Sequence, residues 1–127
     1  MFGGKLLIVD DEAPFVDTVS KRLIKRQVNV IIAYSGQEAL NKLKSEPDVV
    51  LVILDVKMPG MDGIETLKHI KSQYPLIEVI MLTGHANVET AVEGIKYGAF
   101  DYLMKPCDID VLLAKCEEAM TKDLKTL

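Results

Sequence analysis

The sequence lacks the features that mark membrane-spanning and secreted proteins. None of its apolar runs approaches the roughly 18 residues that a membrane span needs. The run near the N-terminus, Leu6 to Val9, is too short for the apolar core of a signal peptide. We therefore expect a cytoplasmic protein that has no membrane partner.

Cysteine is scarce, with only Cys107 and Cys116 in the whole chain. If both lie on one helix, a rise of ~1.5 Å per residue puts them about 13 Å apart, too far for a disulfide. Neither has a CxxC or zinc-type spacing. We expect free thiols in a reducing compartment.

The sequence also lacks a basic stripe of the kind that binds nucleic acid. Its 15 lysines and arginines are outnumbered by 19 acidic residues, which gives a net charge of −4. The one basic cluster, Lys21 to Arg26, fits the solvated face of a helix. Direct binding of nucleic acid is therefore not expected.

What the chain does contain is an ordinary globular composition, 49% hydrophobic and 27% charged over 127 residues. This length fits one domain, residues 1–127, with a core over about 5–120. Repeats, low-complexity tracts and an internal linker are all missing.

Short β-branched runs alternate along the chain with patterns of helical period. We expect strands at Lys5–Val9, Val28–Tyr34, Val49–Leu54, Ile77–Leu82 and Ala99–Met104. Helices are expected over Ala13–Arg26, after Ser35, after Asp62, around Val88–Lys96 and over Ile109–Met120. Five consecutive βα units predict an α/β fold, a doubly wound parallel sheet with five helices on its two faces. We assume the flavodoxin-like strand order 2-1-3-4-5.

Local signals support three of the helix starts. Ser35 and Glu38 have the spacing of a capping box, and Asp62 stands three residues before Glu65. Pro14 falls in the first turn of the first helix, where proline is tolerated.

Polar residues stand where the expected strands end, and ligands of open α/β sheets bind at those carboxyl ends. Each residue alone is unremarkable, since an aspartate can cap a helix and Lys-Pro is a common loop dipeptide. Because these residues stand at the ends of four strands, in chain order, a chance arrangement is improbable. The set consists of Asp10, Asp11 and Glu12 after the first strand, Asp55 after the third, Thr83 after the fourth and Lys105 after the fifth.

The assumed strand order brings these groups into one pocket. Clustered carboxylates repel one another, and a single lysine does not balance three of them. Mg²⁺ prefers oxygen ligands and would offset this charge. Asp55 then has the position of a nucleophile for a phosphoryl group, with Lys105 and the Thr83 hydroxyl as donors to the phosphoryl oxygens.

At this point the chain resembles the receiver domain of two-component response regulators. The motifs that carry the resemblance are "LLIVDDE", "LDVKMPGMDG", "MLTGHA" and "DYLMKP", in the family's order and spacing. The resemblance extends over about Lys5 to Met120.

The resemblance implies a role for each site residue. Asp55 would accept a phosphoryl group from a sensor histidine kinase or a phosphotransfer protein. Asp10, Asp11 and Asp55 would hold Mg²⁺ together with the backbone carbonyl of Lys57. Lys105 would pair with the phosphoryl group, and with Asp55 in the free state. Such a domain is not an enzyme beyond its own phosphoryl transfer and slow autodephosphorylation.

The resemblance also implies a switch and an output. Thr83 would bond to a phosphoryl oxygen, and Tyr102 would turn inward when Thr83 moves. The fourth helix, fifth strand and fifth helix would then bind a downstream effector or a second copy. Lys57 and His85 would tune the phosphoryl lifetime. Gly84 matches the family's preference for a small residue beside the phosphoryl group. The Lys105–Pro106 peptide bond would be cis.

Other protein classes fit less well. A haloacid-dehalogenase-type phosphatase needs Asp-x-Asp on the first strand, but Lys57 fills the second slot after Asp55. A flavodoxin would need a Ser/Thr/Gly-rich phosphate loop after strand one, and P-loop or GxGxxG folds need glycines missing here. A pure interaction module stays possible. The kinase, the pathway, a further effector domain, the oligomeric state and the phosphoryl lifetime are left open.

Overall fold

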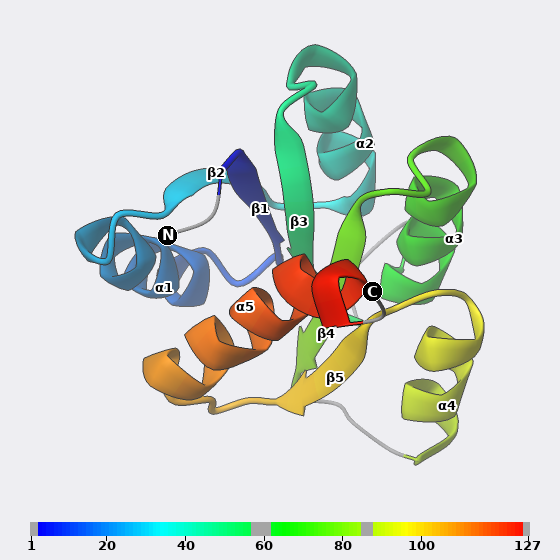
Figure 1. Cartoon of the computed structure of the whole chain (residues 1–127). Coiled ribbons are helices and arrows are strands. Elements are labelled where there is room, and N and C mark those ends of the chain that lie inside the picture. Colours follow the sequence, from blue (N-terminus) through cyan, green and yellow to red (C-terminus); the bar gives the residue numbers. More distant parts are fainter. Residues whose placement is uncertain (1–2, 57–61, 85–87, 126–127) are drawn as a thin grey trace.

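The computed structural model describes residues 3–56, 62–84 and 88–125, the last four by their backbone alone (Figure 1). The strands are β1 (Lys5–Val9), β2 (Asn29–Ala33), β3 (Val49–Leu54), β4 (Glu78–Thr83) and β5 (Asp101–Met104). The helices are α1 (Ala13–Lys25), α2 (Gly36–Ser45), α3 (Gly63–Gln73), α4 (Val88–Lys96) and α5 (Ile109–Lys125).

Three helices begin where the local signals predict. The Ser35 hydroxyl accepts a hydrogen bond from the Glu38 backbone N–H at 3.1 Å, which caps α2. The Asp62 carboxylate accepts one from the Glu65 N–H at 2.9 Å, which caps α3. Pro14 lies in the first turn of α1. Each cap satisfies a backbone donor that the helix itself leaves unpaired.

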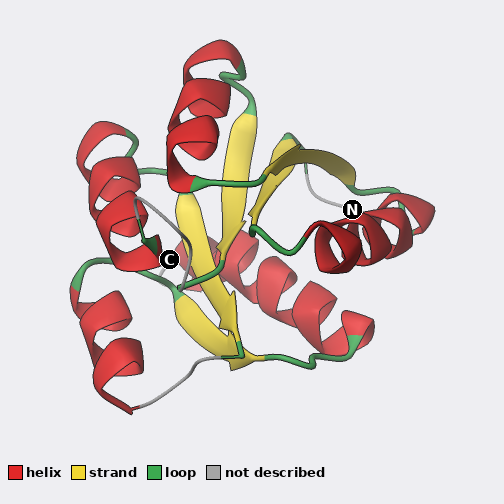
Figure 2. Ribbon diagram, turned by 180° about the vertical axis from the view of Figure 1, so that it is seen from behind, coloured by secondary structure: helices red, strands yellow, loops and turns green. Residues whose placement is uncertain are grey.

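The sheet has the predicted order, β2-β1-β3-β4-β5, and every neighbouring pair is parallel. The arrowheads in Figure 2 therefore point to one edge of the sheet, where the loops carrying the candidate residues begin. The doubly wound α/β prediction is confirmed. In this winding β1 and β3 are adjacent, so the residues that follow these two strands become neighbours.

Helices cover both faces of the sheet (Figures 1 and 2). One core cluster joins the sheet to α2 and α3 and includes the fully buried Leu67 and Ile70. The other joins it to α1 and α5 and includes the fully buried Leu23 and Cys116. Because both faces are covered, the central strands are apolar along almost their whole length, as the run Val49–Leu54 indicates.

Some boundaries differ from the expectation. Helix α5 begins after Cys107, so the two cysteines are not on one helix. Both are nevertheless free thiols, and burial raises the pKa of Cys116 to about 12. Strand β5 begins at Asp101, later than predicted, whereas β4 includes Thr83. Among the described residues, no helix combines the length and apolar character that a membrane crossing requires.

Candidate functional site

Three candidate residues are fixed by backbone hydrogen bonds one position beyond their strands. The Asp10 N–H donates to the last carbonyl of β2 at 3.1 Å, and the Asp55 N–H donates to the last carbonyl of β1 at 3.0 Å. The Lys105 N–H donates to the last carbonyl of β4 at 3.0 Å. The sheet ladder therefore continues just far enough to hold all three backbones at its carboxyl edge.

Gly63 supports the segment behind Asp55. Its N–H donates to the Val56 carbonyl at 2.7 Å, which ties the start of α3 to the end of β3. A Cβ at this position would collide with the Asp55 carbonyl oxygen and the Val56 Cα. Only glycine permits this approach of helix and strand backbone.

Asp10, Asp11 and Asp55 each place a carboxylate oxygen within 4.8 Å of the others, as predicted. Asp10 and Asp55 are each only 2% exposed, whereas Asp11 is exposed. Asp55 Oδ1 is buried and has no hydrogen-bond partner among the described residues. A buried charged oxygen without a partner is costly. The donor set is therefore incomplete in a way that a hard cation would remedy.

Lys105 reaches this cluster and pairs with Asp55, as expected, but it lies closer to two other carboxylates. Its Nζ lies 2.6 Å from Asp10 Oδ2 and 3.0 Å from Glu12 Oε1, against 4.0 Å from Asp55 Oδ2. Nζ also lies 4.2 Å from the centre of the Phe15 ring. The ammonium lies toward the start of α1, because two carboxylates there attract it at closer range than Asp55 and the Phe15 ring adds a cation–π contact.

Burial and pairing shift the pKa values of this pair. Burial raises the pKa of Asp10, and the hydrogen bonds from Lys105 and from the Glu12 N–H only partly oppose this. Burial would lower the pKa of Lys105, but the hydrogen bonds to Asp10 and Glu12 outweigh it and raise that pKa above its ordinary value. The ammonium is thus firmly protonated, while the site as a whole carries excess negative charge.

Thr83 and Gly84 lie where the fourth strand meets the site. Thr83 is fully buried at the end of β4, opposite Met104 of β5. Of the atoms in the described residues, a Cβ at Gly84 would meet only the Lys105 Cβ, at 3.9 Å, which is ordinary van der Waals contact.

Tyr102 lies on β5, as predicted, two residues before Met104 in the register that pairs β5 with β4. Its ring is half-buried against the core cluster on the α2 and α3 face. Its hydroxyl donates to the Met104 sulfur at 3.9 Å, and burial raises its pKa. The peptide bond between Lys105 and Pro106 is cis, as the resemblance implies.

Two of the predicted residues cannot be placed. Lys57, with its carbonyl as a candidate metal ligand, and His85, a candidate tuning residue, lie outside the described residues. Two contacts of Lys105 were not predicted. Glu12 was named in the polar set after the first strand but was given no role, and nothing in the sequence signalled Phe15.

Comparison with known proteins identifies the family of the chain. The response regulator receiver domain family matches residues 6–117. The transcriptional regulatory protein ZraR of Salmonella typhimurium is 42% identical over 128 aligned residues, which cover 99% of this chain and 29% of ZraR. The DNA-binding transcriptional regulator NtrC of Proteus hauseri is 43% identical over 120 residues, which cover 93% of this chain and 25% of NtrC. The chain thus spans less than a third of these relatives.

Solved structures agree over nearly the full length. A CheY-like receiver domain protein from Methanospirillum hungatei JF-1 matches with a TM-score of 0.91 and 33% identity, covering 98% of each chain. The receiver domain of NtrX from Brucella abortus matches with a TM-score of 0.84 and 36% identity, covering 91% of this chain and 97% of that one. Fold, strand order and relatives therefore lead to one conclusion: the chain belongs to the response regulator receiver domain family.

Proposed function

We propose that Asp55 accepts a phosphoryl group in a reaction that requires Mg²⁺. The observation that carries the proposal is the Asp55 carboxylate, buried at a strand end with an unpartnered oxygen among the described residues. Two further aspartates lie within 4.8 Å of it and an ammonium at 4.0 Å. A carboxylate needed only for the fold would cost less free energy on the surface.

Asp10, Asp11 and Asp55 would hold Mg²⁺, with the backbone carbonyl of Lys57 as a further ligand. These are the hard oxygen donors that this ion prefers. When bound, the ion offsets the carboxylate charge that would otherwise repel an anionic phosphoryl donor.

Lys105 and Thr83 would bind the phosphoryl oxygens. Lys105 Nζ is 4.0 Å from Asp55 Oδ2, so the ammonium is within a short movement of a group attached there. Thr83 presents a hydroxyl from the end of the neighbouring strand β4. The missing side chain at Gly84 would leave room for the phosphoryl group beside Lys105.

The donor would be a sensor histidine kinase or a phosphotransfer protein in the cytoplasm. The chain would act as a single receiver domain, residues 1–127, and not as a classical enzyme, since it catalyses only its own phosphoryl transfer and slow autodephosphorylation. Lys57 and His85 would tune the lifetime of the phosphoryl group. Two relatives are named as transcriptional regulators and are more than three times as long as the aligned part, so an effector domain in the native protein is part of the proposal.

The test is incubation with acetyl phosphate, with and without Mg²⁺, followed by intact-mass measurement. Wild type should gain one phosphoryl group only with Mg²⁺, and Asp55→Asn should gain none. Asp17→Asn, an exposed α1 carboxylate, is the matched control and should behave as wild type. Equal masses in all samples would leave the interaction module as the better account.

The output would come from the face formed by α4, β5 and α5. Among the described residues, eight large hydrophobic side chains are exposed, and five of them lie on these elements: Val88, Val92, Ile95, Met104 and Val111. This enrichment indicates a surface that a partner covers.

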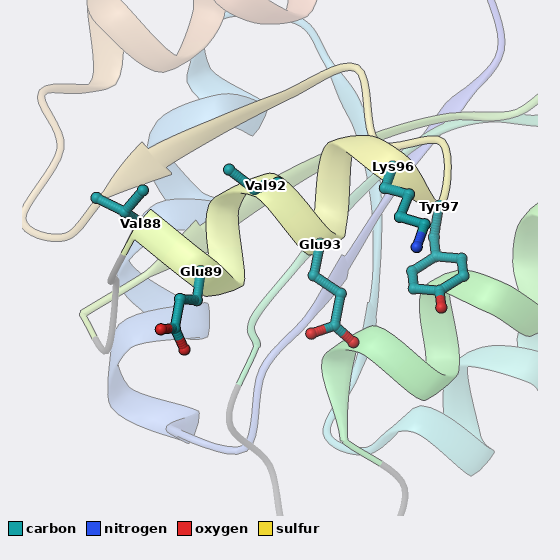
Figure 3. Close-up of a pocket in the computed structure, with 6 residues that line it drawn as sticks. All are labelled: Val88, Glu89, Val92, Glu93, Lys96 and Tyr97. Atoms are coloured by element: carbon teal, nitrogen blue, oxygen red, sulfur yellow. The ribbon is translucent and has the colours of Figure 1, made fainter.

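A shallow pocket of about 430 Å³ runs along α4 on this part of the molecule (Figure 3). Val88 and Val92 project from one side of the helix, and Glu89 and Glu93 from another (Figure 3). The partner would be an effector or a second copy of the domain.

Thr83 and Tyr102 would connect the site to this face. A phosphoryl oxygen that draws the Thr83 hydroxyl inward opens space that the half-buried Tyr102 ring can enter by one rotamer change. The test compares amide NMR spectra with and without beryllofluoride and Mg²⁺. Shifts should reach residues 96–102 and α5, and shifts confined to the pocket would contradict this output.

A further inference from the structure

The carboxylates around Lys105 lie at unequal distances, and the proposed reaction at Asp55 does not require this. Its side chain is only 12% exposed, and its two closest partners come from the segment that joins β1 to α1. Its Nζ lies 2.6 Å from Asp10 Oδ2 and 3.0 Å from Glu12 Oε1, against 4.0 Å from Asp55 Oδ2. The centre of the Phe15 ring is 4.2 Å away. The ammonium thus lies nearer to Asp10 and Glu12 than to Asp55, the residue that would carry the phosphoryl group.

Asp10 and Glu12 differ in what else they do. Asp10 belongs to the acidic cluster and also accepts a hydrogen bond from the Glu12 N–H at 3.0 Å. Glu12 lies outside that cluster, and although it is the N-cap of α1 its side chain makes no capping hydrogen bond. Its side chain is 59% exposed, yet the carboxylate bonds to Lys105. Among the described residues, the contact with Lys105 is therefore the one interaction of this side chain.

We propose that Glu12 is a positioning residue that holds Lys105 on the α1 side of the pocket and so opposes phosphoryl binding at Asp55. The proposal rests on the proposed function of Asp55. When a cation takes up the charge of Asp10, Glu12 is the anion that still competes for the ammonium. Its charge also repels the phosphoryl oxygens. Both effects have the same sign, so removing Glu12 favours the phosphoryl-bound state.

The size of the effect follows from the exposure of Glu12. Ion pairs with an exposed partner are weak, and the loss of one changes an equilibrium by about twofold to fivefold. The expectation is therefore that Glu12→Gln binds beryllofluoride about twofold to fivefold more tightly than wild type at saturating Mg²⁺.

The experiment is a beryllofluoride titration at saturating Mg²⁺, followed by amide NMR of the full chain. Glu12→Asp separates position from charge, because it keeps the charge and shortens the side chain by one C–C bond, about 1.5 Å. It should also bind more tightly than wild type. Asp17→Asn removes one charge from the exposed side of the same helix and is the control, with unchanged affinity expected.

A second readout observes the lysine itself. Without metal, the Lys105 Cε and Nζ signals should shift in Glu12→Gln and Glu12→Asp but not in Asp17→Asn. If Glu12→Asp matches wild type in both readouts, or Glu12→Gln binds no more tightly than Asp17→Asn, the positioning role is wrong. If the wild-type protein binds no beryllofluoride and takes no phosphoryl group from acetyl phosphate, the function proposed for Asp55 is wrong instead.

Discussion

Replacing Asp55 by asparagine should stabilise the metal-free domain. The change removes a charge from a side chain that is 2% exposed, while it keeps the shape nearly constant. Most substitutions at buried positions destabilise a protein, so a gain here has diagnostic value.

The magnitude follows from the charges around Asp55. At an effective dielectric constant of ~20, a carboxylate at the upper limit of 4.8 Å repels it by about 3.5 kcal/mol, and two neighbours lie within that limit. Lys105 at 4.0 Å returns about 4 kcal/mol of attraction. The balance is about 3 kcal/mol of repulsion, which solvent screening of the exposed Asp11 reduces. We expect a gain of about 1–3 kcal/mol in the free energy of unfolding.

The assay is urea and thermal unfolding in a metal chelator and again in saturating Mg²⁺. For a domain of this size about 4 °C accompanies each kcal/mol, so Tm should rise by roughly 4–12 °C in chelator. In Mg²⁺ the gain should vanish or reverse, because the ion stabilises the native state through the carboxylate that the variant lacks. Asp17→Asn should change the stability by less than about 0.5 kcal/mol in both conditions. A destabilised Asp55→Asn in chelator, or an equal gain with Mg²⁺, would refute the electrostatic reasoning.

Four other changes test separate parts of the account. Gly63→Ala should cost about 1–3 kcal/mol and slow phosphorylation, measured by urea unfolding and acetyl phosphate labelling, because its Cβ meets strand backbone. Ser20→Ala should raise stability by about 1 kcal/mol, since the buried Ser20 hydroxyl has no partner within the described structure; a lower urea midpoint would contradict this. Gln27→Gly should stabilise by up to about 1 kcal/mol, because Gln27 has φ 67° after α1. Burial would raise the pKa of Asp101, but its hydrogen bond with Lys115 outweighs this and lowers that pKa below 3.8. The pair therefore stabilises the fold fully above pH 3.8, and this contribution is lost as the pH falls through the lower pKa of the folded state. Lys115→Met should remove that part of the pH dependence in acid unfolding curves, worth at most about 1 kcal/mol at this exposed position.

Local patterns predict the elements and their order. Alternating β-branched runs and helical periods identify five βα units, and the caps at Ser35 and Asp62 identify two helix starts. The positions of Asp10, Asp55 and Lys105 follow from the same patterns, because each stands directly after a strand in a parallel sheet. Periodicity of 2 or 3.6 residues is a short-range property, which a single sequence retains.

The contacts inside the site could not be predicted in the same way. Lys105 pairs with Asp55 as expected, but its closer contacts with Asp10 and Glu12 were not predicted. A long side chain has several rotamers, and the choice among them depends on charges far apart in sequence. The start of β5 was placed too early for a similar reason. The Phe100 N–H donates to the Val79 carbonyl at 2.7 Å, and the register with β4 runs from Asp101 onward. The neighbouring strand therefore determines where β5 begins, not the local run of residues.

The central claim is that Asp55 accepts the phosphoryl group. The most direct measurement is peptide mapping by mass spectrometry after acetyl phosphate treatment and chemical trapping of the acyl phosphate. The account predicts one modification, at Asp55, that forms with Mg²⁺ and is missing when a chelator is present. A modification at another residue, equal labelling without Mg²⁺, or no labelling in Mg²⁺ would contradict it.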